Sequence, residues 1–141
     1  MMAEKTGFES IEHTADLAVR AWAEDMRGLI EQAARGMLDL MLKEPPAAVE
    51  TVEVVGEGES REELIVDCLR GILLLINVRG LVPVSVEVSS SSEERAVCMV
   101  GVVPLDEGRE ALVEEIKAVT YHGIDVRQED DSLGVEVVFD V

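Results

Sequence analysis

The chain has 141 residues, of which 48% are hydrophobic and 30% charged, a balance typical of one globular domain with a hydrophobic core. Its 12 Lys and Arg residues against 30 Asp and Glu residues give a formal net charge of −18. Such an acidic surface repels phosphate backbones and anionic lipids, so neither direct nucleic-acid binding nor membrane association is expected.

The first half of the chain alternates between strand and helix patterns. Val19, Ala21 and Ala23 alternate with Arg20, Trp22 and Glu24, and this period of two predicts a half-buried strand. Asp25 is the predicted N-cap of a helix of about 17 residues, because the apolar residues that follow it recur every three or four positions. Pro45-Pro46 ends this helix, since proline cannot continue one.

A second strand and helix are predicted next. The strand covers about residues 49–55, and a turn at Gly56-Glu57-Gly58 follows it. Ser60 and Glu63 have the spacing of a capping box, in which each side chain accepts from a backbone N–H of the other. They open a helix that ends before Gly80.

The remainder of the chain is predicted to be almost entirely strand. Pro83 indicates an edge strand or a strand start, because proline cannot donate to a ladder. Consecutive strands with short connections pair antiparallel, and the two amphipathic helices need a face to cover. We therefore expect an α+β fold, mostly antiparallel sheet packed by two helices, as one domain over residues 1–141. The strand candidates are Leu81–Val88, Arg95–Val103, Ala111–Val119, Ile124–Gln128 and Val135–Asp140.

The cysteine content indicates a reducing compartment. Cys68 and Cys98 lie in apolar segments without Cys-x-x-Cys spacing, so we expect two buried free thiols and a cytoplasmic location. No apolar run approaches the roughly 20 residues that a bilayer span needs. The N-terminus, with Glu4 and Lys5, lacks the apolar core of a signal peptide.

The last residues of the chain suggest a cation site. Asp140 follows a strongly apolar strand on the face opposite Phe139, and Val141 would add a second carboxylate at the terminus. With a third carboxylate, this hard-oxygen pair would suit Mg²⁺, Mn²⁺ or Ca²⁺. The alternative is that Asp140 is an ordinary surface acid. No His/Cys cluster has the ligand spacing of a zinc or iron–sulfur site.

Other polar residues have both a structural and a functional interpretation. Asp16 precedes the first strand and could simply bond the backbone in a turn. Lys117 could be an outward lysine, or a cation that offsets carboxylates or holds a phosphate. His13, His122 and Tyr121 could equally be structural. No nucleophile elbow, phosphate-binding glycine loop or His-Glu-x-x-His pattern is present, so the residues alone indicate no catalytic machinery.

Four segments together resemble the archease family, in the right order and over essentially the whole chain. Two departures are Cys68, where a Trp is expected, and Ala23, where a Gly is common; neither touches the proposed site. The matching segments are Phe8 to Ala23 (FESIEHTADLAVRAWA), Ala33 to Met37 (AARGM), Lys117 to His122 (KAVTYH) and Val138 to Val141 (VFDV).

The resemblance implies a function and a set of site residues. Archeases are accessory proteins of the GTP-dependent RNA ligase of tRNA splicing, so this chain is expected to promote guanylylation of that ligase and its multiple turnover. It also implies a divalent metal ion held by Asp16, Asp140 and the terminal carboxylate of Val141. Lys117 matches a functionally important lysine, whereas His13 and His122 match signature histidines of unassigned role. The two ends of the chain are thus expected to converge.

Two other functions remain open at this stage. One is a metal-dependent phosphate hydrolase that uses Asp16 and Asp140, although two-metal sites usually need more carboxylates. The other is a chaperone-like adaptor that serves RNA-modifying enzymes through its acidic surface. The activator is preferred because the archease resemblance implies it, and the protein is not expected to be an enzyme itself.

Overall fold

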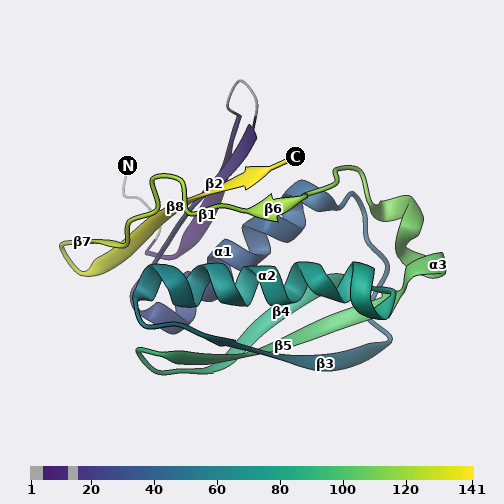
Figure 1. The fold of residues 1–141 in the computed structure, drawn as a ribbon, viewed down its shortest axis with the longest axis horizontal. Coiled ribbons are helices and arrows are strands. Elements are labelled where there is room, and N and C mark those ends of the chain that lie inside the picture. The colour runs from purple at the N-terminus through teal and green to yellow at the C-terminus, as the bar shows by residue number, and fades with distance from the viewer. Residues whose placement is uncertain (1–4, 13–15) are drawn as a thin grey trace.

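The computed structural model describes residues 5–12 and 16–141, and this part of the chain forms two antiparallel sheets with two long helices (Figure 1). The helices α1 (Met26–Met41) and α2 (Arg61–Arg79) lie between the sheets. Each contacts strands of both sheets, so the apolar faces of helices and sheets enclose one core. The predicted α+β class is confirmed.

The first sheet has the order β1-β2-β8-β6, and β7 also pairs with β8. In this sheet β2 and β8 align antiparallel over their whole length, from Asp16 opposite Asp140 to Ala23 opposite Leu133. This register brings residues near both ends of the described chain into adjacent strands. The bounds are β1 Gly7–Glu12, β2 Asp16–Ala23, β6 Ala118–Val119, β7 Arg127–Glu129 and β8 Ser132–Asp140.

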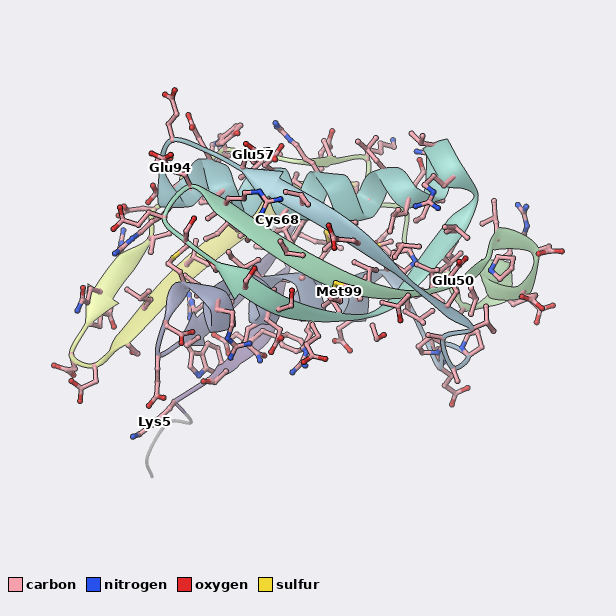
Figure 2. All side chains as sticks on the ribbon, turned by 90° about the horizontal axis from the view of Figure 1, so that it is seen from below. Lys5, Glu50, Glu57, Cys68, Glu94 and Met99 are labelled. Carbon is pink, nitrogen blue, oxygen red and sulfur yellow. The ribbon has the colours of Figure 1, made fainter. Side chains whose placement is uncertain are left out.

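The second sheet has the order β3-β5-β4, built from β3 (Glu50–Glu57), β5 (Arg95–Pro104) and β4 (Leu81–Ser91). Its inner face is apolar, whereas its outer face, seen in Figure 2, carries Met99 flanked by acidic neighbours on both adjoining strands. Pro83 lies in β4, an edge strand, as its missing N–H predicts.

Both helix starts are confirmed. The Asp25 carboxylate accepts the N–H of Gly28 at 2.8 Å, and the Ser60 hydroxyl accepts the N–H of Glu63 at 3.1 Å. α2 ends at Arg79 and is capped by Gly80, whose φ of 64° lies in the left-handed region that favours glycine.

The predicted strand over residues 111–119 is mostly wrong, because only Ala118 and Val119 of this range belong to a strand, β6. A short helix α3 (Leu105–Gly108) and a 3-10 turn η1 (Arg109–Ala111) precede the segment, which then runs without regular structure and joins the first sheet only at β6. The N–H of Val113 donates to the carbonyl of Met41 at 2.8 Å, at the end of α1, so this segment connects two layers instead of pairing along its length.

The predicted strand over residues 124–128 is also mostly wrong, because only Arg127 and Gln128 of this range belong to β7, which runs to Glu129. The reason is again a long-range bond. The N–H of Val126 donates to the Glu62 carboxylate of α2 at 2.7 Å, which draws the chain away from the ladder.

The two cysteines are buried and free, as predicted. Cys68 on α2, which is labelled in Figure 2, contacts Cys98 on β5. The hydrogen bond to Cys98 and burial raise the pKa of the Cys68 thiol well above its usual range. This shift disfavours the thiolate of Cys68, the form that reacts with electrophiles.

We expect iodoacetamide at pH 8 to alkylate both cysteines of the native protein at least roughly 100-fold more slowly than in urea, because reagent access requires opening of the core. Intact-mass measurement over time would follow the reaction, and the urea-unfolded chain should take up two groups. Equal rates in the native and unfolded protein would contradict the buried position of this pair.

Candidate functional site

The β2–β8 register places two acidic residues next to each other. Asp16 opens β2 and Asp140 closes β8, and the two are directly opposite across the antiparallel pair. Residues so placed share one face of the sheet with Cβ atoms about 4.5–5.5 Å apart, within reach of a single cation. The predicted convergence of the chain ends is therefore confirmed for this pair.

The two carboxylates differ in their surroundings. The Asp140 side chain is exposed, whereas Asp16 is half-buried and its Oδ1 atom is buried. Both lie on the outer face of the sheet, because the alternate residues Val137 and Phe139 of β8 belong to the core. The pair thus combines a half-buried carboxylate with an exposed one.

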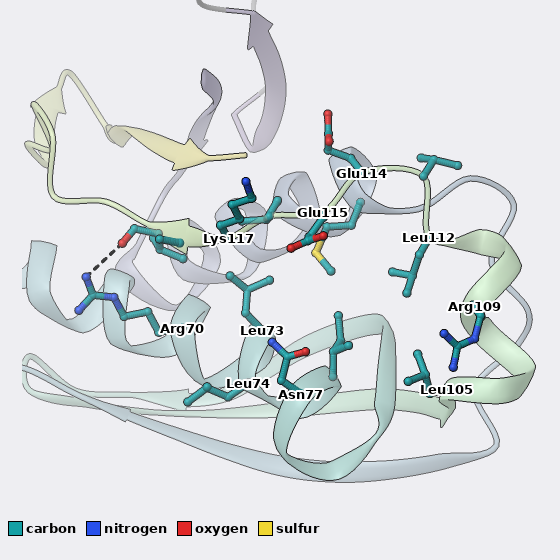
Figure 3. Close-up of a pocket in the computed structure, with 16 residues that line it drawn as sticks. Arg70, Leu73, Leu74, Asn77, Leu105, Arg109, Leu112, Glu114, Glu115 and Lys117 are labelled. Carbon is teal, nitrogen blue, oxygen red and sulfur yellow. Dashed lines mark hydrogen bonds between the residues drawn. The ribbon is translucent and has the colours of Figure 1, made fainter. Parts of the chain in front are cut away.

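Lys117 reaches the same end of the sheet from the other side of β8. Its backbone N–H donates to the carbonyl of Asp140 at 2.8 Å, and the next residue, Ala118, is opposite Asp140 in the β6–β8 pair. The Lys117 side chain is exposed and extends toward the end of β8 (Figure 3). Asp140 therefore has a carboxylate on one neighbouring strand and a lysine just before the other.

The end of β8 is held by packing. Val141 is half-buried and its side chain packs against the core, on the face opposite Asp140. This agrees with the prediction that the strand does not fray. The carboxylate of Val141 as a metal ligand stays a prediction.

A cavity of about 750 Å³ on the outer face of the first sheet is lined by Asp16 and His122 together. His122 lies in the loop after β6, where its backbone N–H donates to the Thr120 hydroxyl at 3.2 Å. That hydroxyl in turn donates to the carbonyl of Val138 at 3.0 Å, which ties the loop to β8. Two of the predicted site residues, distant in sequence, therefore border one cavity.

Arg20 and Glu136 also line this cavity and were not identified from the sequence. Arg20 forms ion pairs with Glu9 at 2.9 Å and Glu136 at 3.5 Å across three adjacent strands. Their positions in the sequence could have identified them. Arg20 lies an even number of residues from Asp16 and Glu136 an even number from Asp140, so each lies on the outer face of the sheet with that aspartate. Such an exposed network orders the cavity wall more than it stabilises the fold.

Other predicted residues lie elsewhere. His13 is outside the residues that the structure describes. Tyr121 is 47% exposed, and the Arg70 guanidinium lies 4.9 Å from its ring centroid, so the ring serves as a surface platform for a cation.

The structure leaves the metal site a prediction. Among the described residues, no three His, Cys, Asp or Glu side chains converge closely enough to hold a metal ion. The predicted ligand set has only two side chains, and its third ligand is the terminal carboxylate of the chain. It is therefore not a group of three side chains. The donors that are present, Asp16 and Asp140, are hard oxygens on one face, and they fit a divalent cation of the Mg²⁺, Mn²⁺ or Ca²⁺ type.

Comparison with known proteins gives the family. The model of the Archease protein family (MTH1598/TM1083) matches residues 8–141. The chain belongs to the archease family. Among curated archeases it is similar to "Protein archease" of Methanopyrus kandleri, with 35% identity over 138 residues that cover 95% of this chain and 99% of that one. It is 33% identical to "Protein archease" of Thermococcus gammatolerans, over 86% of this chain and 88% of the other.

Solved archease-family structures have the same fold. The crystal structure of "an archease, possible chaperone" from Thermotoga maritima matches with a TM-score of 0.68 and 28% identity, covering 93% of this chain and 94% of that one. The solution structure of Methanobacterium thermoautotrophicum protein 1598 matches with a TM-score of 0.70 at 24% identity, over 96% and 99% of the two chains. In the described part of this archease, no helix is long and apolar enough to cross a membrane.

Proposed function

We propose that this archease is an accessory protein that binds a divalent metal ion and activates the GTP-dependent RNA ligase of tRNA splicing, promoting its guanylylation and multiple turnover. Family membership supports the accessory role. The observation that carries the metal-binding part is the direct opposition of Asp16 and Asp140 at one end of the first sheet. The partner is the ligase protein, and the expected compartment is the cytoplasm.

Asp16, Asp140 and the carboxylate of Val141 would hold the ion, which could be Ca²⁺, Mg²⁺ or Mn²⁺. When bound, it would supply positive charge for the phosphate oxygens of a nucleotide at the ligase. Lys117 adds a second cationic group beside Asp140 and can offset the carboxylates or contact a phosphate. His122 lines the cavity that includes Asp16, so it is placed to contact whatever enters.

The net charge of −18 is consistent with an accessory protein of an RNA-binding enzyme. A ligase that binds RNA presents a basic surface, so an acidic activator is steered toward it and repelled by RNA itself. The encounter should become slower as salt screens the attraction. The accessory protein can then associate, act and leave without competing for the RNA.

The test is a turnover count. Purified ligase with limiting GTP and excess RNA ends should pass from about one turnover to many when this protein is added. Asp16→Asn should remove most of the stimulation, whereas Asp39→Asn, an exposed aspartate on α1, should retain it. Stimulation by Asp16→Asn equal to that of the wild type would refute the proposed role of the carboxylate pair.

A second candidate is a chaperone-like adaptor, favoured by the description of the Thermotoga maritima relative as a possible chaperone. An adaptor that works through its acidic surface would keep its activity after chelation of divalent ions and lose it after charge reversal elsewhere. Hydrolysis of GTP or phosphate esters by this protein alone, lost in Asp16→Asn, would instead indicate the hydrolase.

A further inference from the structure

A second cavity, of about 870 Å³, lies between α2 and the segment from Leu105 to Val119, away from the outer face of the first sheet (Figure 3). Its wall on the helix side includes Leu73 and Leu74, and Val113 lines it from the opposite segment. Leu74 is 55% exposed and Val113 59%. We call this cavity and the adjoining face of α2 the α2 groove.

The apolar surface continues beyond the cavity along the helix. Val78 is four residues after Leu74, on the same face of α2, and is 72% exposed. A surface helix normally carries polar residues on its solvent side, and α2 does not at these positions. Clustered exposed apolar side chains are typical of a protein interaction site, and Val78 extends this cluster beyond the residues that line the cavity.

The charges around the α2 groove differ from those of the whole molecule. Arg70 lies at one end and Arg109 at the other, and the charged residues between them are Lys117, Glu114 and Glu115 (Figure 3). Among the described residues, neither arginine forms an ion pair, despite the 30 acidic residues of the chain. Arg70 donates to the carbonyl of Val119 at 3.1 Å and keeps further N–H donors available.

We propose that the α2 groove binds an amphipathic helix of the RNA ligase that lies outside its basic RNA-binding surface. Apolar residues of that helix would face Leu74 and Val78, and an acidic residue near each end would face Arg70 and Arg109. The i, i+4 spacing of the exposed α2 residues suits ridge-into-groove contact with a second helix. The net charge of −18 disfavours anionic lipid or nucleic acid as the occupant. This inference rests on the proposed function, because it names the surface that holds the ligase.

The groove is separate from the carboxylate pair. Its lining comes from α2 and from the segment after β5, which includes Lys117, whereas Asp16 and Asp140 belong to β2 and β8 and do not line it. Docking and activation are therefore expected to fail independently. A variant of the groove should bind the ligase weakly, and a variant of the carboxylate pair should bind it but stimulate it poorly.

The test measures the dissociation constant for the purified ligase by isothermal titration calorimetry. The double variant Leu74→Ser/Val78→Ser and the variant Arg109→Glu should each bind about 10-fold or more weakly, since central anchors dominate an interface. Matched controls are Val49→Ser, which changes an apolar residue that is 65% exposed outside the groove, and Arg95→Glu, which reverses an exposed arginine on β5. Both should bind within about 2-fold of the wild type.

Three outcomes would overturn the inference. If the groove variants bind like the wild type while Asp16→Asn loses stimulation, the α2 groove is not the ligase-binding surface and the proposed function stands. If the wild-type protein neither binds nor stimulates the ligase, both fail. If sedimentation shows that the protein alone is a dimer that the groove variants dissociate, the occupant is a second copy of this chain. Unchanged circular dichroism of each variant excludes unfolding as the cause of weak binding.

Discussion

Replacing Asp140 by Asn should lower the affinity for Mn²⁺ by about 100-fold or more, because loss of a direct ligand costs at least as much as loss of an outer-shell partner. Asp140 is one half of the opposed carboxylate pair and its exposed side chain is the accessible half. An amide keeps the shape but removes the charge that a hard cation requires. Asp16→Asn should have an effect of similar size.

Thermal unfolding with and without metal gives the readout. At a metal concentration of about 100 times Kd, the wild-type protein should be stabilised by about 2.7 kcal/mol, which corresponds to a rise in Tm of roughly 10 °C. Asp140→Asn should show almost no rise, and Asp39→Asn should behave like the wild type. A full metal-dependent rise in Asp140→Asn would disprove the assigned ligand.

The carboxylate of Val141 has its own test within the same experiment. A short Gly-Ser extension after Val141 converts that carboxylate into a neutral amide and should reduce the metal-dependent rise in Tm. The same extension at the N-terminus should leave it unchanged. Equal behaviour of the two extended proteins would remove Val141 from the ligand set and leave the Asp16–Asp140 pair in place.

Replacing Glu31 by Ala should destabilise the fold by about 3 kcal/mol, with a fall in Tm of roughly 10 °C. Glu31 is 9% exposed on α1, and its carboxylate accepts the N–H of Val88 on the open edge of β4 at 2.9 Å. It also pairs with Arg27 and Arg35, one turn away on either side. Its loss leaves the buried N–H of Val88 without an acceptor and removes the ion pairs of Arg27 and Arg35 with Glu31.

Urea unfolding of Glu31→Ala, Glu31→Gln and Glu53→Ala would check this. The amide of Gln keeps an acceptor for Val88 but loses the charge, so Glu31→Gln should be intermediate. Glu53 is exposed on β3, so its truncation should change stability by no more than about 0.5 kcal/mol. A Glu31→Ala protein as stable as Glu53→Ala would show that the contact with β4 contributes nothing.

The Glu31 contact also protects the second sheet. Arg27 donates to the carbonyl of Val88 at 3.2 Å, so both backbone groups of this edge residue are bonded to side chains of α1. An uncovered strand edge is a template for pairing with another chain. Glu31→Ala is therefore the variant of this series most prone to aggregate.

Several features of this protein follow from the sequence by itself. The caps at Asp25, Ser60 and Gly80, the alternation of buried residues in β2 and β8, and the edge position of Pro83 were all predictable. Each depends on atoms within a few residues of one another, or on the covalent form of one residue. Such rules do not require knowledge of what else is nearby.

Other features of the fold and of the candidate site depend on the tertiary structure. The residues between Ala111 and Lys117 have strand-like composition but bond to the end of α1, and Val126 bonds to a side chain of α2. The family resemblance anticipated that Asp16 and Asp140 meet, but local patterns do not, because 124 positions separate them in the chain and only the β2–β8 register places them opposite each other. Backbone groups in these segments bond to whatever partner the fold brings within reach, and no local pattern names that partner.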